Sequence, residues 1–192
     1  MHLGVDEAGK GPVLGSMFAA AVRADPDALP GDVDDSKEIE PGRREELHAE
    51  IREVADSVAV AEIPVTRIDD PETDMNSLTV AAHAEALAGV APADGPNDET
   101  QSLSTSQPHS DSFPAYADAG DTNAARFERR IASRVDGVDL RAEHGADATY
   151  PIVGAASVVA KVERDAHVAR LAEEFGDVGS GYPSDPTPRE FL

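Results

Sequence analysis

The first twelve residues carry two adjacent carboxylates followed by a lysine between two glycines. Asp6 and Glu7 end a short apolar run, and Lys10 lies between Gly9 and Gly11. Carboxylate oxygens are ligands that hard divalent cations prefer. Glycines let a backbone approach another group closely because no Cβ intervenes. This opening therefore predicts a cation site beside a positively charged loop that can reach a phosphate.

Further carboxylates must complete such a site. Hydrolysis of a phosphodiester by two cations needs several oxygen ligands that converge on ions about 3.5–4 Å apart. The chain has 38 acidic residues, so position must select among them. Asp118 follows a short apolar segment and Asp147 precedes a long predicted helix, which are positions that a cleft at one edge of a sheet would collect. Taken singly, each remains open to a role as a cap, turn or solvated carboxylate, and Asp121 competes with Asp118.

Side chains on a regular strand alternate between the two faces of a sheet. Asp6 and Glu7 can therefore serve one site only where the strand ends or bulges. The glycines that follow favour such a departure from regular geometry, and we expect the first strand to end at this pair.

Hydrophobic patterning predicts one α/β domain over residues 1–192 that begins with a β-hairpin. The predicted strands are residues 3–6, 13–23, 58–63, 115–118 and 138–141. One predicted helix begins at residue 41, and three others cover residues 76–87, 123–134 and 151–174. Residues 91–114 are rich in Pro, Ser, Asp and Thr and poor in apolar side chains, so we expect a disordered insertion there.

Composition excludes several classes of protein. The chain contains no cysteine, so it has no disulfide framework, thiolate metal site or thiol nucleophile. No run of apolar residues approaches the length of a membrane span, and acidic residues interrupt the start where a signal peptide would be basic and then apolar. We therefore expect a cytoplasmic protein without a membrane partner.

The formal net charge is -22, which by itself argues against a polyanionic partner. The acidic residues are scattered over the whole chain, however, as in proteins from salt-loving cells. At about 1 M salt the Debye length is about 3 Å, so distant surface charge is screened while close contacts persist. The three lysines, Lys10, Lys37 and Lys161, each lie beside small or hydroxyl-bearing residues. We interpret them as phosphate contacts, with chance placement on solvated faces as the alternative.

Five segments of the chain occur in the order seen in archaeal ribonuclease HII. They are residues 6–12, 35–37, 116–121, 146–165 and 179–186. The chain resembles that family from end to end. The resemblance implies a ribonuclease H-like fold with a mixed, mainly five-stranded sheet flanked by helices. It also implies a metal-dependent endonuclease.

Matched by motif, the four metal-binding acids of that family fall on Asp6, Glu7, Asp118 and Asp147. The implied cofactors are two Mn²⁺ or Mg²⁺ ions. The implied reaction is hydrolysis of the RNA strand of RNA–DNA hybrids and cleavage 5′ to ribonucleotides embedded in duplex DNA. The products carry 5′-phosphate and 3′-hydroxyl ends.

The resemblance also implies residues that contact the substrate: Gly9, Lys10, Gly11, Ser36, Lys37, Ser157, Lys161 and Tyr182. Relatives more often carry arginine where this chain has Lys10. The lysine keeps the positive charge but lacks the planar fork of a guanidinium group. Asp165 is expected to support the site rather than bind metal. His144 is a candidate proton carrier, with an ordinary surface histidine as the alternative.

We further expect a monomer. Many archaeal relatives contact a sliding clamp through a C-terminal peptide, and no such peptide is visible in this chain. Relatives generally continue into further C-terminal helices, which we expect to be absent or truncated here. Two rival functions remain open at this point: a DNA-specific nuclease of the same fold, and a non-catalytic acidic module whose carboxylates hold cations.

Overall fold

The computed structural model describes residues 1–33, 39–92 and 112–191, and in these ranges it contains a five-stranded mixed sheet. The strands are β1 (His2–Ala8), β2 (Met17–Ala24), β3 (Ser57–Ile63), β4 (Phe113–Asp118) and β5 (Val138–Glu143), in the spatial order β3-β2-β1-β4-β5. β1 pairs antiparallel with β2 and parallel with β4, and β4 pairs parallel with β5. The predicted hairpin and the mixed sheet are both confirmed.

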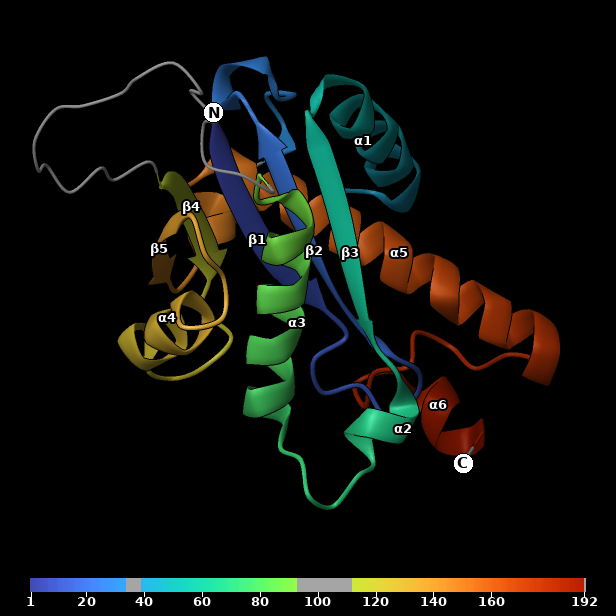
Figure 1. Ribbon diagram of the computed structural model, residues 1–192. Coiled ribbons are helices and arrows are strands. Elements are labelled where there is room, and N and C mark those ends of the chain that lie inside the picture. The colour runs from blue at the N-terminus through green and yellow to red at the C-terminus, as the bar shows by residue number, and fades with distance from the viewer. Residues whose placement is uncertain (34–38, 93–111, 192) are drawn as a thin grey trace, which may run out of the picture.

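Helices cover both faces of this sheet, so the domain has three layers (Figure 1). The helices are α1 (Pro41–Val54), α2 (Val65–Ile68), α3 (Met75–Val90), α4 (Ala124–Ala132), α5 (Pro151–Phe175) and α6 (Pro186–Phe191). α3 and α4 pack on one face and build one apolar core with it. α1 and α5 build a second core on the opposite face. The two shorter helices, α2 and α6, were not predicted from the sequence.

Alternation along β1 divides its side chains between these two cores. Leu3 and Val5 belong to the core beneath α3 and α4. Asp6 pairs in register with Ala20, which belongs to the core beneath α1 and α5. Because successive side chains of a strand point to opposite faces, Glu7 lies on the side of α3. The faces of the sheet therefore separate two neighbouring carboxylates.

A glycine in β1 lets α5 approach the sheet closely. A Cβ built on Gly4 would lie 2.2 Å from the backbone oxygen of Ile152, in the first turn of α5. The residues at 155–157 in the same helix are small and fully buried, as expected for a face that packs tightly on a sheet. The start of α5 is thereby held directly over β1.

Several boundaries differ from the prediction. β1 continues through Glu7 to Ala8 instead of ending at the acidic pair, and β2 begins at Met17, four residues after the predicted start. The side chain of Asp74 caps α3 by accepting from the Ser77 N–H, so the helix begins before the predicted Asn76. β4 begins at Phe113, inside the segment expected to be disordered. The rest of that segment between residues 93 and 111, and the predicted contacts Ser36 and Lys37, lie outside the described residues.

None of the helices in the described ranges has both the length and the apolar character needed to cross a bilayer.

Candidate metal centre and glycine loop

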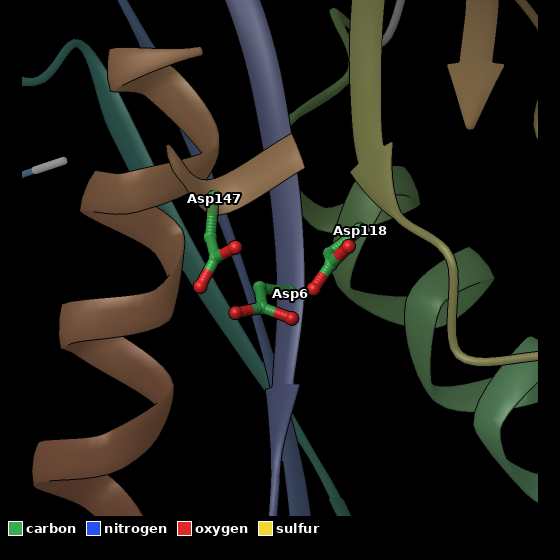
Figure 2. A group of neighbouring side chains, drawn as sticks. All are labelled: Asp6, Asp118 and Asp147. Atoms are coloured by element: carbon green, nitrogen blue, oxygen red, sulfur yellow. The ribbon is translucent and has the colours of Figure 1, made fainter. Parts of the chain in front are cut away.

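Three of the four predicted acids converge on one point. One carboxylate oxygen each of Asp6, Asp118 and Asp147 lies within 4.8 Å of the other two. The side chains come from β1 near its C-terminal end, from the end of β4 and from the turn before α5, and they point toward one another (Figure 2). All donor atoms are carboxylate oxygens, which suits a hard divalent cation such as Mg²⁺ or Mn²⁺.

Asp118 is positioned by two features: the pairing of β4 with β5, and a turn that follows β5. Its Oδ1 accepts hydrogen bonds from the backbone N–H of Gly145 at 2.7 Å and of Ala146 at 3.2 Å. Gly145 has φ 70°, a left-handed conformation that glycine adopts without strain. Asp118 therefore anchors the turn that carries Asp147. That aspartate lies in the short 3₁₀ helix η3 (Ala146–Ala148) and is 3% exposed.

The electrostatics of Asp6 are those of a buried, negatively charged cluster. Burial raises the pKa of Asp6 well above its ordinary value, and the negative charges of Glu7 and Asp118 raise it further, although a hydrogen bond from Ser157 opposes this. A bound cation would offset this unfavourable negative charge. The cluster thus passes a chemical test for a metal centre.

Ser157 and Lys161 lie one turn apart on α5 and connect to Asp6. The Ser157 hydroxyl is fully buried, donates to Asp6 and accepts a 2.8 Å hydrogen bond from the Lys161 ammonium. This burial gives Ser157 a role in holding Asp6. Lys161 is half-buried, and its ammonium group lies next to the Ser157 hydroxyl that binds Asp6.

Glu7 does not belong to the three-aspartate group. Its Oε2 lies 2.7 Å from Nε2 of His83, a fully buried residue of α3. Burial raises the pKa of Glu7, but the hydrogen bond and charge of His83 and the charge of Lys10 outweigh this effect, so the pKa lies below its ordinary value. Glu7 is therefore an anion next to the cluster, held from the opposite face of the sheet.

Two other acids considered from the sequence have different partners. Asp121 binds the guanidinium group of Arg126 through both its oxygens, at 2.6 and 2.8 Å from Nη2. Asp165 accepts a 2.7 Å hydrogen bond from Arg44 and thereby joins α5 to α1. Of the two competing residues, Asp118 is the one that lies in the three-aspartate group, and the role of Asp165 near the site stays a prediction.

The glycine loop between β1 and β2 lies beside the C-terminal tyrosine motif. Gly9 and Gly11 both have φ 87°, a left-handed conformation that residues with a Cβ rarely adopt. The N–H of Gly9 donates a 3.1 Å hydrogen bond to the hydroxyl of Tyr182. The fold therefore brings together two of the predicted substrate-contacting motifs. Lys10 points to another element, with its ammonium 3.5 Å from Oδ1 of Asn76 in α3.

The sequence interpretation missed Arg164, a nearly fully buried residue of α5. Its guanidinium group donates to the Leu14 carbonyl at 2.7 Å and lies 6.0 Å from the centre of the Tyr182 ring. A Cβ on Gly9 would approach its Nε to 2.9 Å, and one on Gly181 would approach its Nη2 to 2.7 Å. Arg164 thus packs against both the glycine loop and the tyrosine motif. His83 was missed as well, because a lone histidine in an alanine-rich helix gives no sign of its partner.

His144, the candidate proton carrier, is exposed at the end of β5 and precedes the turn that Asp118 anchors. Its position keeps it near Asp147 in the chain. We retain it as a candidate.

Comparison with known proteins gives a consistent result. A family model described as Ribonuclease HII matches residues 3–192. Ribonuclease HII from Haloarcula marismortui is 62% identical over 193 residues, covering 100% of this chain and 83% of that protein. The Halobacterium salinarum protein of the same name is 56% identical, covering 100% and 82%. Both relatives come from halophilic archaea, in agreement with the acidic composition.

Solved structures agree in fold. The chain is similar to the ribonuclease HII structure described as the PCNA:RNase HII complex from Archaeoglobus fulgidus, with a TM-score of 0.83, 37% identity and coverage of 99% of this chain and 84% of that chain. For ribonuclease H2 from Pyrococcus horikoshii the values are 0.81, 32%, 98% and 83%. From the match over nearly its whole length and the shared fold, we conclude that this chain belongs to the ribonuclease HII family, a family of hydrolytic nucleases.

Proposed function

We propose that this protein is an endonuclease that hydrolyses the RNA strand of RNA–DNA hybrids and cuts 5′ to ribonucleotides embedded in duplex DNA. The products would carry 5′-phosphate and 3′-hydroxyl ends. One observation carries the proposal: Asp6, Asp118 and Asp147 come from three separate elements and converge within 4.8 Å. Membership of the ribonuclease HII family supports the choice of substrate.

The proposed cofactors are two Mn²⁺ or Mg²⁺ ions, held by Asp6, Glu7, Asp118 and Asp147. When bound, such ions activate water for attack on the phosphate and stabilise the oxygen that leaves. The chain's own part is to hold the ligands. Asp118 is fixed by the Gly145 and Ala146 amides, Asp6 by Ser157, and Glu7 by His83. Ligands held in this way need little rearrangement when the substrate arrives.

Selectivity for a ribonucleotide is assigned to the glycine loop and Tyr182. The 2′-hydroxyl is the group that distinguishes RNA from DNA at a given site, and it can both donate and accept a hydrogen bond. Gly9 and Gly11 let the backbone approach that group. Because the Gly9 N–H binds the Tyr182 hydroxyl, loop and ring are positioned as one unit.

We assign contacts with the substrate's phosphate groups to the lysines, and two of these lysines have a serine hydroxyl beside them. We propose Lys10 and Lys161 from the described residues, with Ser157 orienting Lys161. Ser36 and Lys37 keep the same role as a proposal, since they lie outside the described residues. Contacts at hydrogen-bond range are the kind that survive in concentrated salt.

The proposed partners are an RNA–DNA hybrid or a duplex that contains ribonucleotides. The Archaeoglobus fulgidus structure is described as a complex of RNase HII with PCNA. We propose that the present protein acts as a monomer in the cytoplasm, with a sliding clamp as a further candidate partner.

The test is cleavage of an end-labelled DNA duplex containing one ribonucleotide, in molar KCl with Mn²⁺, Mg²⁺ or EDTA. We expect metal-dependent cutting just 5′ to the ribonucleotide, with no cutting of an all-DNA duplex and none by Asp147→Asn. Cutting of both duplexes would instead identify a DNA-specific nuclease. Binding of the duplex without cutting under any metal condition would favour a non-catalytic module.

A further inference from the structure

Glu7 occupies an unusual position for a metal-binding carboxylate. It is adjacent in the chain to Asp6, yet β1 is regular through Ala8, so the two side chains leave the strand on opposite faces. Asp6 faces α5 and the other two aspartates. Glu7 faces α3, where only 12% of its side chain is exposed. Its orientation must be set by residues of that face.

The first such residue is His83. Its Nε2 lies 2.7 Å from Oε2 of Glu7, and its side chain is fully buried. An ionised carboxylate can only accept hydrogen bonds, so the imidazole must donate from Nε2. The contact therefore requires a proton on Nε2 and binds one oxygen of Glu7.

The remainder of the His83 ring adds no further polar contact. Its Nδ1 is buried and has no hydrogen-bond partner among the described residues. The ring packs edge-to-face on Phe127 of α4, with 5.0 Å between the ring centres. A buried, unsatisfied nitrogen is unfavourable for folding and calls for an explanation. Among the described residues, the polar contact of this buried ring is therefore the one that Nε2 makes with Glu7.

The other oxygen of Glu7 meets a second boundary. A Cβ built on Gly120 would lie 2.9 Å from Oε1 of Glu7 and 2.8 Å from Cγ2 of Thr79. The loop after β4 thus passes so close to the carboxylate that a side chain at residue 120 has no room. His83 thus binds one oxygen of Glu7, and the loop at Gly120 passes close to the other.

We propose that His83 is a positioning residue for the metal centre: by donating to Glu7 from the far face of the sheet, it holds that carboxylate in the orientation in which it binds metal. The proposal rests on the assignment of Glu7 to the metal centre in the proposed function. Partners that orient metal ligands in this way typically change metal affinity by about 10- to 100-fold when they are removed.

The direct test is Mn²⁺ binding to the metal-stripped, full-length protein without substrate, measured by titration calorimetry in molar KCl. His83→Leu removes the donor and is expected to weaken Mn²⁺ binding by about 10- to 100-fold. His83→Gln provides an amide N–H that can still donate to Glu7, so it should bind Mn²⁺ within about threefold of the wild type. His83→Phe keeps an aromatic ring against Phe127 and should behave like His83→Leu, which keeps the test valid if the leucine variant does not fold.

Phe127→Leu is the matched control, because it changes the packing of the His83 ring but leaves the donor in place. Thermal unfolding without metal is recorded for each variant. Wild-type Mn²⁺ affinity in folded His83→Leu or His83→Phe would overturn the proposal. An equal loss in Phe127→Leu and His83→Gln would also overturn it, because packing would then be the cause. Since the assay contains no nucleic acid, its outcome is separate from whether the protein cleaves an embedded ribonucleotide.

Discussion

The backbone N–H of Gly9 donates a 3.1 Å hydrogen bond to the hydroxyl of Tyr182, which is 173 residues further along the chain. This contact joins the loop after β1 to the C-terminal motif, with Arg164 buried beneath both. The two segments are therefore held together in the folded protein. Under the proposed function, a ribose would meet both segments together and not either segment alone.

The first prediction concerns this contact. Tyr182→Phe keeps the ring but removes the acceptor for Gly9, so the loop loses a fixed position. We expect kcat/KM for a duplex with one ribonucleotide to fall by roughly 10-fold, the equivalent of one hydrogen bond of about 1.4 kcal/mol. Mn²⁺ binding should not change. Tyr150→Phe is the control, since its hydroxyl binds Glu143 instead, and it should cleave the duplex at the wild-type rate. Equal activity of both variants would contradict the role assigned to Tyr182.

The second prediction separates Asp118 from its competitor Asp121. Asp118→Asn retains Oδ1 to accept from Gly145 and Ala146, so the turn should persist while the charge is lost. Loss of several kcal/mol of stabilisation by the metal centre corresponds to a decrease of about 10³-fold or more in cleavage rate. Asp121→Asn removes an equal charge from the Arg126 pair and should retain activity within about threefold, since it leaves the cluster intact. Single-turnover cleavage and thermal unfolding of both variants provide the check. Similar losses in the two would show that Asp118 has no special role.

The third prediction follows from the raised pKa of Asp6. In the folded, metal-free protein this carboxyl binds its proton more tightly than in the unfolded chain, so ionisation disfavours the folded state. Below the ordinary pKa of 3.8, Asp6 is protonated in both states and imposes no such penalty. As pH rises from there through the raised folded pKa, stability is lost, and the loss is complete above that value.

Asp6→Asn carries no charge at any pH and should be more stable than the wild type at neutral pH without metal. The difference between their unfolding free energies should shrink as pH falls toward the ordinary pKa. Denaturant unfolding in EDTA at a series of pH values measures it. Mn²⁺ should then reverse the order, because only the wild type has the full set of ligands. A pH-independent difference would mean that Asp6 titrates normally.

The fourth prediction concerns the contact between Gly4 and α5. In Gly4→Ala the new methyl group would lie 2.2 Å from the Ile152 backbone oxygen, so helix or strand must move. We expect a loss of about 3 kcal/mol in unfolding free energy, at the upper end for overpacking. Gly42→Ala is the matched control, because no atom lies within 4 Å of the added Cβ in α1 and alanine favours a helix. It should be as stable as the wild type or more stable, as judged by the denaturation midpoint. Wild-type stability in Gly4→Ala would refute the close approach.

The local sequence pattern predicted most of the strands and helices of the fold. Apolar runs and proline starts located the five strands and the four longer helices, with boundaries that shifted by a few residues. The strand glycine at residue 4 was a signal of close backbone approach that the interpretation did not use. Two short helices were missed because a single turn has too few residues for a periodic pattern to emerge.

The candidate site divides in the same way. The identities of the acids, the glycine loop and the tyrosine motif could be taken from the sequence, because residue type and order along the chain define them. Which acids converge could not, since Asp6, Asp118 and Asp147 meet through the parallel pairing of β1 with β4 and the placement of the start of α5 over β1. The prediction that β1 ends at the acidic pair was wrong, because register with β2 continues to Ala8.

By itself, then, the sequence determined the family, the kinds of ligand available and the elements that carry them, all of which follow from residue type, periodicity and order. The tertiary structure decided that Asp121 pairs with Arg126, that Ser157 holds Asp6 and that His83 holds Glu7. The physical reason is that hydrogen bonds and charge pairs act over a few ångströms. Residues far apart in the chain come within that range only when strand order and helix packing bring them together.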